Sequence, residues 1–378
     1  MSDSVAGIRV LIAAGGTGGH LYPGIAIAEE WMRMHPDSHV VFVGTPRGPE
    51  TKAVPAAGFT IRTIAARGLP RRPGLGWILA AFGLVKSLVQ AFQLVVELKP
   101  HIVVGTGSYV SAPVVLIARL FGIPVIIQEQ NSVPGVTNRW LNLLANEVHI
   151  SFVESRSYFR RKNNLRVSGN PIRRSLLNQD RTSAYEALGL DPGKRTLFVF
   201  GGSRGAQSIN RAVAGALERL KHRSVLQVIW QTGSDDFEAI RDRFQSFPIR
   251  VRVYAYLQDI EKAYAVADLA ICRAGAMTIA ELTACGVPAI LVPYPHATRD
   301  HQTHNARGLS DRDAAEVIAD QDLEPELLAS RVESLFQDDS RLRRIGRNAR
   351  AFARVDAAQR IARSMEQLVH AGPIPHEG

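Results

Sequence analysis

Cysteine is scarce in this sequence of 378 residues, which contains only Cys272 and Cys285. Both stand in apolar surroundings, and no CxxC spacing occurs. The pattern therefore excludes a disulfide framework and a zinc site, and it fits the reduced environment of a cytosol. The first residues include the acidic Asp3 and only a short apolar run, so we expect a first strand there rather than a signal peptide.

Familiar motifs of nucleotide chemistry are missing as well. Counted from Gly16 and Gly18, the third glycine of a GxGxxG fingerprint would fall on Leu21. The second predicted strand ends in Gly44 and Thr45, where an acidic residue would bind a ribose. Both departures disfavour a nicotinamide dehydrogenase. No GK[ST] follows a glycine-rich loop, which excludes a Walker P-loop, and no DxD motif stands near a strand end to hold a metal.

Acidic residues are too few to balance the basic ones, and the net charge is +10. Residues 1–170 carry +8, from 17 Lys and Arg against 9 Asp and Glu, whereas residues 171–378 carry only +2. A basic first half favours an anionic partner such as anionic lipid, phosphate groups or nucleic acid. Charge that serves solubility alone is the alternative at this point.

Apolar runs of strand length alternate with helical patterns along the chain, and no short repeat or low-complexity tract appears. Such runs are typical of parallel strands buried on both faces. A polar, basic stretch around 168–180 separates two series, so we expect an α/β protein with two Rossmann-like domains. We place these at 1–172 and 173–354, with a helical segment at 355–378 that packs back on the first. The predicted strands are 9–13, 39–43, 102–104 and 124–127, then 196–200, 225–230, 251–254, 269–271 and 289–292.

A glycine-rich loop follows the first strand of each series. Residues 15–20 read GGTGGH, and residues 201–205 read GGSRG. Glycines let the backbone approach a ligand, and a helix N-terminus presents free N–H groups to an anion. Thr17 and Ser203 add hydroxyl donors, so the two loops predict diphosphate binding in a cleft between two domains. Tight turns that bind nothing are the alternative, which is weaker for two matched loops than for one.

Two further loops stand at predicted strand ends, GTGSY at 105–109 and QEQN at 128–131. Ligands of open α/β sheets bind at the carboxyl ends of the strands. We therefore expect these loops to border a ligand.

Seven motifs together cover nearly the whole chain. In order they are GGTGGHLYPGIAIA, GTGSYVSAP, QEQNSVPGVTNRW, GNPIR, FGGSRGAQSIN, CRAGAMTIAELTACGVPAILVPYPHAT and DHQTHNA. They resemble the MurG family, transferases that convert lipid I to lipid II in peptidoglycan synthesis. The resemblance implies a GT-B fold and an inverting, metal-independent transfer of N-acetylglucosamine from UDP-GlcNAc to the C4 hydroxyl of MurNAc in lipid I. It implies no cofactor and no nucleic acid partner.

The resemblance also assigns a donor site, most of it in the second domain. Glu281 can accept hydrogen bonds from both ribose hydroxyls, although a plain surface carboxylate is the commoner case for such a residue. Ser203 and Thr278 can donate to phosphate oxygens. The segment 296–302 is one residue longer than the family pattern, so the assignment of Gln302 to sugar hydroxyls depends on anchoring the alignment at 305–306. The matching positions are Thr17, Gly18, Gly19, Asn131, Arg173 as a cation, Ser203, Ile260 beside the uracil, Ala276, Met277, Thr278, Ile279, Ala280, Glu281 and Gln302.

Inverting transfer needs a general base for the acceptor hydroxyl. His20 is the first candidate, because a helix N-terminus would lower its pKa and keep it neutral. Capping of the helix, or a hydrogen bond to acceptor phosphate, is the other interpretation of His20. Glu129 is the second candidate, either as the base or as a group that orients the acceptor. Gly16 and Tyr109 are expected to contact the acceptor.

The stretch 75–96 has apolar residues at helical spacing, long enough to suggest a membrane span. Polar residues interrupt it, so we expect a helix that lies on the membrane and also packs on the core. Leu75, Trp77, Ile78 and Phe82 would face lipid, and Arg67, Arg71 and Arg72 just before them would meet anionic headgroups. The expected location is the cytoplasmic face of the inner membrane, as a peripheral protein.

Three other functions remain open from the residues. A diacylglycerol glycosyltransferase shares the fold and also works on membranes, but uses a different donor and acceptor. A UDP-GlcNAc 2-epimerase shares the fold without a membrane patch, and would release ManNAc and UDP without an acceptor. A noncatalytic subunit that binds nucleotide sugars would bind its ligand without turnover.

Overall fold

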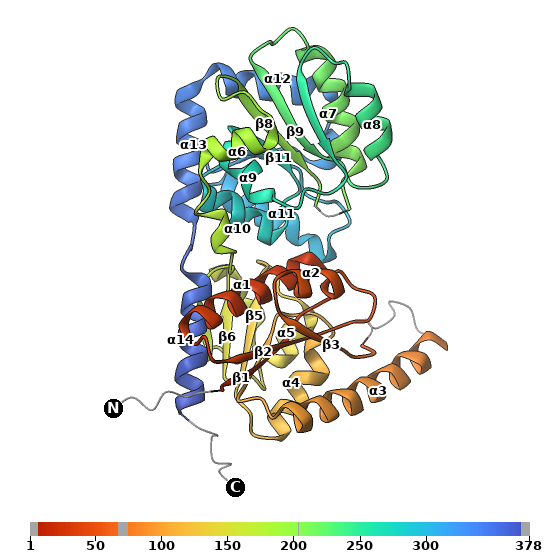
Figure 1. The fold of residues 1–378 in the computed structure, drawn as a ribbon, viewed down its shortest axis with the longest axis vertical. Coiled ribbons are helices and arrows are strands. Elements are labelled where there is room, and N and C mark those ends of the chain that lie inside the picture. The colour runs from red at the N-terminus through yellow and green to blue at the C-terminus, as the bar shows by residue number, and fades with distance from the viewer. Residues whose placement is uncertain (1–6, 67–74, 203, 372–378) are drawn as a thin grey trace. The chain divides into compact units, whose positions relative to one another are not determined.

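The structure, a computed structural model, describes residues 7–66, 75–202 and 204–371, with side chains described from Phe82 onward in the helix that begins at Leu75. The chain divides into two compact units (Figure 1). Unit 1 comprises residues up to Arg173 together with those from Arg354 onward, and unit 2 comprises Arg174–Ala353.

Unit 1 is built on a seven-stranded sheet in the order β3-β2-β1-β4-β5-β6-β7, all parallel. The order reverses beside β1, which places the loops after β1 and β4 at a switch point where ligands of such sheets bind. The strands are β1 (Arg9–Ala13), β2 (His39–Gly44), β3 (Thr60–Thr63), β4 (Ile102–Gly105), β5 (Val125–Glu129), β6 (Glu147–Ile150) and β7 (Leu165–Val167).

Alternate residues of β1 point into two separate cores of unit 1, as the two-residue period of a strand requires. Val10 and Ile12 join one core, and Leu11 and Ala13 join the other. The first core contains side chains of α1 (Gly18–Met34), of α2 (Glu50–Ala56) and of α14 (Ala357–His370), which lies against α1. The second contains side chains of α3 (Leu75–Leu98) and α4 (Ser111–Leu120). The short α5 (Val136–Leu141) follows β5.

Unit 2 has a six-stranded parallel sheet in the order β10-β9-β8-β11-β12-β13. Its main core contains residues of α7, α12 and α13 and the buried Trp230. The strands are β8 (Arg195–Phe200), β9 (Leu226–Gln231), β10 (Arg250–Tyr254), β11 (Leu269–Cys272), β12 (Ala289–Leu291) and β13 (Glu316–Val317). The helices are α6 (Arg181–Leu188), α7 (Gln207–Leu220), α8 (Phe237–Phe244), α9 (Ile260–Val266), α10 (Ala276–Cys285), α11 (His301–Ser310), α12 (Pro325–Gln337) and α13 (Asp339–Phe352).

The last helical stretch of the chain is broken between α13 and α14. Ala353 adopts an extended conformation, with φ −66° and ψ 144°, where the chain passes from unit 2 back to unit 1. The apolar face of α13 includes Leu342 and Ile345 in the core of unit 2, whereas Ile361 and Met365 of α14 are buried in unit 1. The two helices therefore bury their apolar faces in different units, on either side of the extended Ala353.

Candidate active site

The first glycine-rich loop lies between β1 and α1, at the carboxyl edge of the unit 1 sheet. Thr17 is the N-cap of α1 in an extended conformation, and its Oγ1 lies 3.0 Å from Nδ1 of His20. Gly18 and Gly19 are the first two helical residues, whose N–H groups have no acceptor within the helix. His20 is half-buried. The structure therefore places Thr17 and His20 together at the N-terminus of α1, whereas their predicted roles stay predictions.

A buried carboxylate that sequence reasoning missed supports this loop. Glu50, the first residue of α2, is 0% exposed. One of its oxygens accepts hydrogen bonds from the backbone N–H and the hydroxyl of Thr45, each at 2.7 Å. The other accepts from the N–H of Gly16 at 3.2 Å. The N–H of Gly16 thus points at Glu50 and not toward a ligand, which leaves the helix N-terminus as the anion-binding part of the loop.

Glu50 also explains the glycines around it. A Cβ atom added at Gly15 would lie 2.5 Å from Glu50 Oε1, and one added at Gly48 would lie 2.0 Å from Oε2. The glycine at position 44 at the end of β2 is as crowded, 2.5 Å from Cγ of Glu50. These glycines make room for a carboxylate of the protein rather than for a ligand. Two of them, at positions 44 and 48, lie within six residues of Glu50 in the sequence, which is the signal that could have found it.

The loop after β4 places Tyr109 beside the first glycine loop. Its hydroxyl would lie 3.2 Å from a Cβ at Gly16, and its side chain is 38% exposed. The same loop is tied to α5, because a Cβ at Gly107 would lie 2.6 Å from Nδ2 of Asn138. Gly16 and Tyr109, which are expected to contact the acceptor, are therefore neighbours.

Glu129, at the end of β5, is 1% exposed and accepts four hydrogen bonds. Its Oε1 accepts from the backbone and side chain of Asn131 at 2.9 and 3.3 Å. Its Oε2 accepts from the N–H of Gly135 at 3.1 Å and from Nδ2 of Asn138 at 2.9 Å. Burial raises the pKa of Glu129, and these hydrogen bonds act against that rise. The carboxylate is directed into its own loop, and it holds Asn131.

A buried polar network links the ends of β4, β5 and β6 to the GNPIR segment. Nδ2 of Asn170 donates to the carbonyl of Gln130, and its Oδ1 accepts from Ser151 at 2.6 Å and from Gln128 at 3.0 Å. Gln130 donates in turn to the carbonyl of Thr106 at 2.8 Å. Because buried polar groups need partners, this network fixes the path of the chain at Asn170, three residues before Arg173. The guanidinium of Arg173 lies 5.2 Å from the centre of the Tyr22 ring.

The second glycine-rich loop follows β8, and its glycines pack against main chain. A Cβ at Gly205 would lie 1.9 Å from the carbonyl oxygen of Thr232, and one at Gly233 would lie 2.3 Å from the carbonyl oxygen of Arg204. Gln231 donates to the carbonyl of Gly202 at 2.9 Å. The loops after β8 and β9 therefore touch backbone to backbone. Ser203 lies outside the described residues, so its predicted role stays a prediction.

Helix α10 begins at the carboxyl end of β11 and carries most of the predicted donor residues, from Ala276 to Glu281. Thr278 and Glu281 are half-buried, whereas Met277 and Ile279 are buried. The carboxylate of Glu281 accepts a 2.9 Å hydrogen bond from the hydroxyl of Tyr264 on α9. Ile260 is the first residue of that same helix. Gln302, on α11, accepts a hydrogen bond from the N–H of Tyr294 at 2.9 Å.

Arg273, between β11 and α10, is a functional candidate that sequence reasoning passed over. Its guanidinium pairs with Asp320 at 2.5 Å and donates to Ser208 Oγ at 2.8 Å. It also lies 5.4 Å from the centre of the Tyr294 ring. The arginine thus ties the start of α10 to the start of α7 at the mouth of unit 2.

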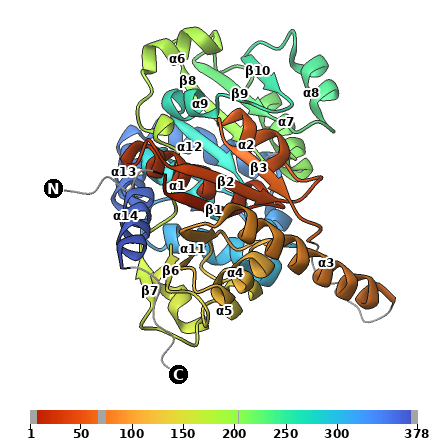
Figure 2. The same cartoon turned by 60° about the horizontal axis from the view of Figure 1, so that its bottom comes forward.

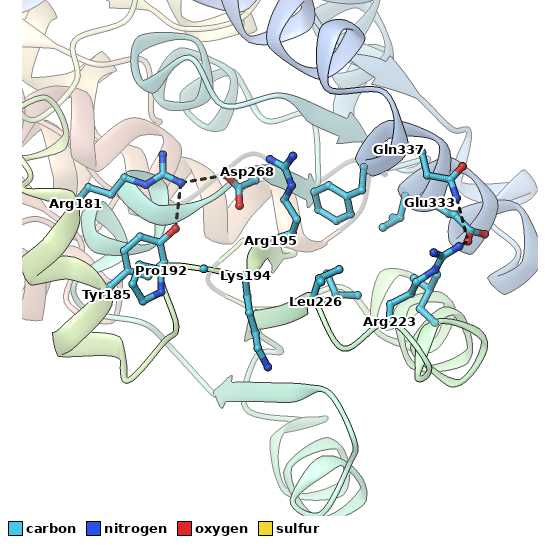
Figure 3. A pocket seen from close by; sticks show the side chains of 15 residues that line it. Arg181, Tyr185, Pro192, Lys194, Arg195, Arg223, Leu226, Asp268, Glu333 and Gln337 are labelled. Atoms are coloured by element: carbon cyan, nitrogen blue, oxygen red, sulfur yellow. Dashed lines mark hydrogen bonds and ion pairs between the residues drawn. The ribbon is translucent and has the colours of Figure 1, made fainter.

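A cavity of about 460 Å³ lies at the opposite, amino edge of the unit 2 sheet (Figure 3). Two of its three arginines are engaged within it: Arg181 pairs with Asp268 at 3.0 Å and bonds to Tyr185, and Arg223 pairs with Glu333. None of the predicted donor residues lines it. The cavity is therefore separate from the candidate site.

Helix α3 projects from the body of unit 1 (Figures 1 and 2). Phe82 is 72% exposed, and Phe92 contacts Phe121 after α4 at 5.6 Å between ring centres. Leu75, Trp77 and Ile78 lie in α3, but their side chains are outside the described part. Among the described residues, no helix is long and apolar enough to cross a membrane, and no cluster of three potential metal ligands occurs. The exposed residues, named here the α3–α4 surface, are Phe82, Val85, Val89, Phe92, Leu120 and Phe121.

Two family models match most of the chain. The glycosyltransferase family 28 N-terminal domain matches residues 10–150, and the glycosyltransferase family 28 C-terminal domain matches residues 196–361. A curated relative from Chlorobaculum parvum is 44% identical over 359 residues, which are 94% of this chain and 98% of the relative. Another from Geobacter metallireducens is 43% identical and covers 95% and 98%. Both are named UDP-N-acetylglucosamine--N-acetylmuramyl-(pentapeptide) pyrophosphoryl-undecaprenol N-acetylglucosamine transferase.

Solved structures support the same family and the same fold. MurG from Acinetobacter baumannii aligns with a TM-score of 0.73 at 31% identity, over 95% of this chain and 99% of that one. A UDP-N-acetylglucosamine 2-epimerase aligns with a TM-score of 0.70 at 13% identity, over 99% of both chains, which shows the shared fold alone. The predicted GT-B fold of two Rossmann-like sheets is confirmed. The chain belongs to glycosyltransferase family 28, in its MurG group.

Proposed function

We propose that this glycosyltransferase moves N-acetylglucosamine from UDP-GlcNAc to the C4 hydroxyl of MurNAc in lipid I, with inversion, giving lipid II and UDP. The observation that carries the proposal is the near full-length similarity to relatives that are named for this reaction. Six of the residues that resemble the donor site, Ala276 to Glu281, lie on α10, which begins after the carboxyl end of β11.

The donor would bind along α9, α10 and α11. Glu281 accepts from the ribose hydroxyls, Ile260 packs beside the uracil, and Gln302 holds sugar hydroxyls. The first N–H groups of α10, from Ala276 to Thr278, and the Thr278 hydroxyl face the diphosphate, because a helix N-terminus favours an anion. Arg173 adds cationic stabilisation to the leaving UDP.

Unit 1 would bind and activate the acceptor. His20 accepts the proton of the attacking hydroxyl, and the Thr17 hydroxyl, 3.0 Å from Nδ1 of His20, orients its ring. Glu129 serves better as an orienting group than as the base, because its four hydrogen bonds come from the loop after β5 and from α5. Through them it presents Asn131 to the substrate. Gly16 and Tyr109 border the acceptor.

The test is an assay of the purified full chain with radiolabelled UDP-GlcNAc and lipid I, in which labelled lipid II is expected. Transfer to diacylglycerol, with UDP-galactose as the better donor, would support the rival lipid glycosyltransferase instead. Release of ManNAc without an acceptor would identify an epimerase. The His20→Ala variant should lose about 10²- to 10⁴-fold in kcat while its UDP affinity is retained. Unchanged turnover in that variant would rule out His20 as the base.

We also propose that the enzyme docks on an anionic membrane surface through the α3–α4 surface. Exposed Lys86 on α3 and half-buried Arg119 on α4 stand within this apolar region, and each basic group near anionic lipid contributes about 1 kcal/mol. A cytoplasmic membrane face would bring unit 1 to its lipid-linked acceptor. Leu75, Trp77 and Ile78 are proposed to extend the contact.

Flotation with vesicles that contain anionic phospholipid tests this docking. Phe82→Ser and Leu120→Ser, at side chains that are 72% and 71% exposed, should each weaken binding severalfold. Val225→Ser changes an exposed apolar side chain of unit 2 and is the matched control, which should float like the wild type. Equal flotation of all four proteins would exclude the α3–α4 surface as the docking site.

A further inference from the structure

We propose that Tyr264 is a positioning residue of the donor site, which fixes the Glu281 carboxylate in the orientation that receives the ribose hydroxyls. The inference rests on the proposed role of Glu281 as the ribose ligand. Nothing in the resemblance of the motifs assigns a role to Tyr264.

The geometry is specific. The hydroxyl of Tyr264 donates to Oε2 of Glu281 at 2.9 Å, from the last turn of α9 to the second turn of α10. Tyr264 is 1% exposed, whereas Glu281 is half-buried. The tyrosine is thus a fixed internal support for a carboxylate at the surface of the site.

The tyrosine ring itself has little freedom. It meets the rings of Phe198 and Phe200 edge-on, at 5.5 and 5.8 Å between centres and interplanar angles of 86° and 82°. Those two rings stack on each other at 4.4 Å, on β8. Edge-to-face packing of this kind favours one ring orientation. The position of the hydroxyl is therefore set by the core of unit 2 and not by the ligand.

The chemistry of the pair suits a permanent donor. Burial and the neighbouring Glu281 raise the pKa of Tyr264 well above its ordinary value, so the phenol keeps its proton throughout the physiological range. A carboxylate has about four acceptor positions, of which this bond uses one. A neutral donor also leaves the negative charge of Glu281 in place, which strengthens its hydrogen bonds to ribose hydroxyls.

Preorganisation is what the bond would contribute. A free glutamate side chain loses rotamer freedom when it binds a ligand, and that loss weakens affinity. Because Tyr264 holds Glu281 in the folded protein, this rotamer freedom is lost during folding instead of during binding. Helix α9 would then recognise the nucleoside twice, with Ile260 at its start beside the base and Tyr264 in its last turn behind the ribose ligand.

The test uses Tyr264→Phe, which removes one hydroxyl and keeps the ring. Calorimetric titration of the full chain should show UDP binding five- to tenfold weaker, or about 1 to 1.4 kcal/mol. With 2′,3′-dideoxyuridine 5′-diphosphate, which lacks both hydroxyls, the variant and the wild type should agree within twofold. In turnover, KM for UDP-GlcNAc should rise while kcat stays, because binding in the ground and transition states is lost equally.

Tyr185→Phe is the matched control. Its hydroxyl is also bonded, to Arg181 at 3.1 Å, but at the amino edge of the sheet, so UDP affinity should not change. Glu281→Ala distinguishes a failure of the positioning role of Tyr264 from a failure of the ribose role of Glu281. If Glu281→Ala weakens UDP binding and Tyr264→Phe does not, the positioning role is wrong and the donor site stands. If Glu281→Ala also has no effect, the ribose role of Glu281 is wrong. Equal losses with UDP and the dideoxy analogue would likewise overturn the positioning role.

Discussion

The two units place similar glycine-rich loops after their first strands, but they hold these loops in different ways. In unit 1 the loop after β1 rests on a side chain, the buried carboxylate of Glu50. In unit 2 the loop after β8 rests on main chain, the carbonyl of Thr232. A side chain can be replaced or can shift, whereas a backbone carbonyl in a sheet edge cannot. The glycine-rich loop of unit 1 should therefore tolerate substitution better than the one of unit 2.

The largest effect is expected at Gly205. Its φ of +76° and the 1.9 Å between an added Cβ and the Thr232 oxygen leave no place for alanine. Gly205→Ala should cost about 3 kcal/mol or more in the free energy of unfolding, measured with urea. Gly202→Ala is the control, because its φ of +87° is also positive but its Cβ meets nothing within 4 Å. It should cost only about 1 kcal/mol, from strain alone. Similar losses in both variants would contradict the role of the backbone contact.

The next effect is a coupling between Gly15 and Glu50. Glu50→Ala should cost about 2–4 kcal/mol, because the N–H groups of Gly16 and Thr45 lose a buried acceptor. Gly15→Ala should destabilise by its clash with Glu50 Oε1. In the double variant the clash is gone. Its loss of unfolding free energy should therefore be smaller than the sum of the two single losses by about 1 kcal/mol or more. Simple additivity would show that the carboxylate does not hold the loop.

The smallest effect concerns pH. Burial raises the folded-state pKa of Glu129 above its ordinary value of 4.5, so the folded protein binds this proton more tightly than the unfolded chain. The associated stability is present below pH 4.5 and is lost as the pH rises through the folded-state pKa. Between pH 4.5 and the folded-state pKa, the free energy of unfolding should fall less steeply in Glu129→Gln than in the wild type. Gly202→Ala, in the other unit, should retain the wild-type slope. Identical slopes in all three proteins would contradict the burial effect.

Much of the fold follows from the sequence, because apolar strand runs alternate with helices that begin after glycine-rich turns. The weaker strands β3, β6, β7 and β13 escaped prediction: TIRT is largely polar, and the other three have two to four residues. The break between α13 and α14 escaped it too, since it is set by two separate cores rather than by a local breaker.

The candidate site follows from the sequence where its residues stand in a recognisable motif, and was missed where a residue supports the motif. His20, Asn131 and Glu281 stand in recognisable patterns. Glu50 and Tyr264 act on those patterns from 34 and 17 positions away in the chain, which local spacing does not reveal. Glu129 was found by its motif, but its orientation into its own loop is a tertiary property.

The return of the chain to unit 1 has a consequence for synthesis. Unit 2 is one continuous segment, Arg174–Ala353, whereas unit 1 needs both ends of the chain. Ile361, Ala362 and Met365 of α14 belong to the same core as Val10 and Ile12 of β1. Domains are generally completed in the order in which they leave the ribosome. Here the second unit can finish folding first, and the first must wait for the last helix to emerge.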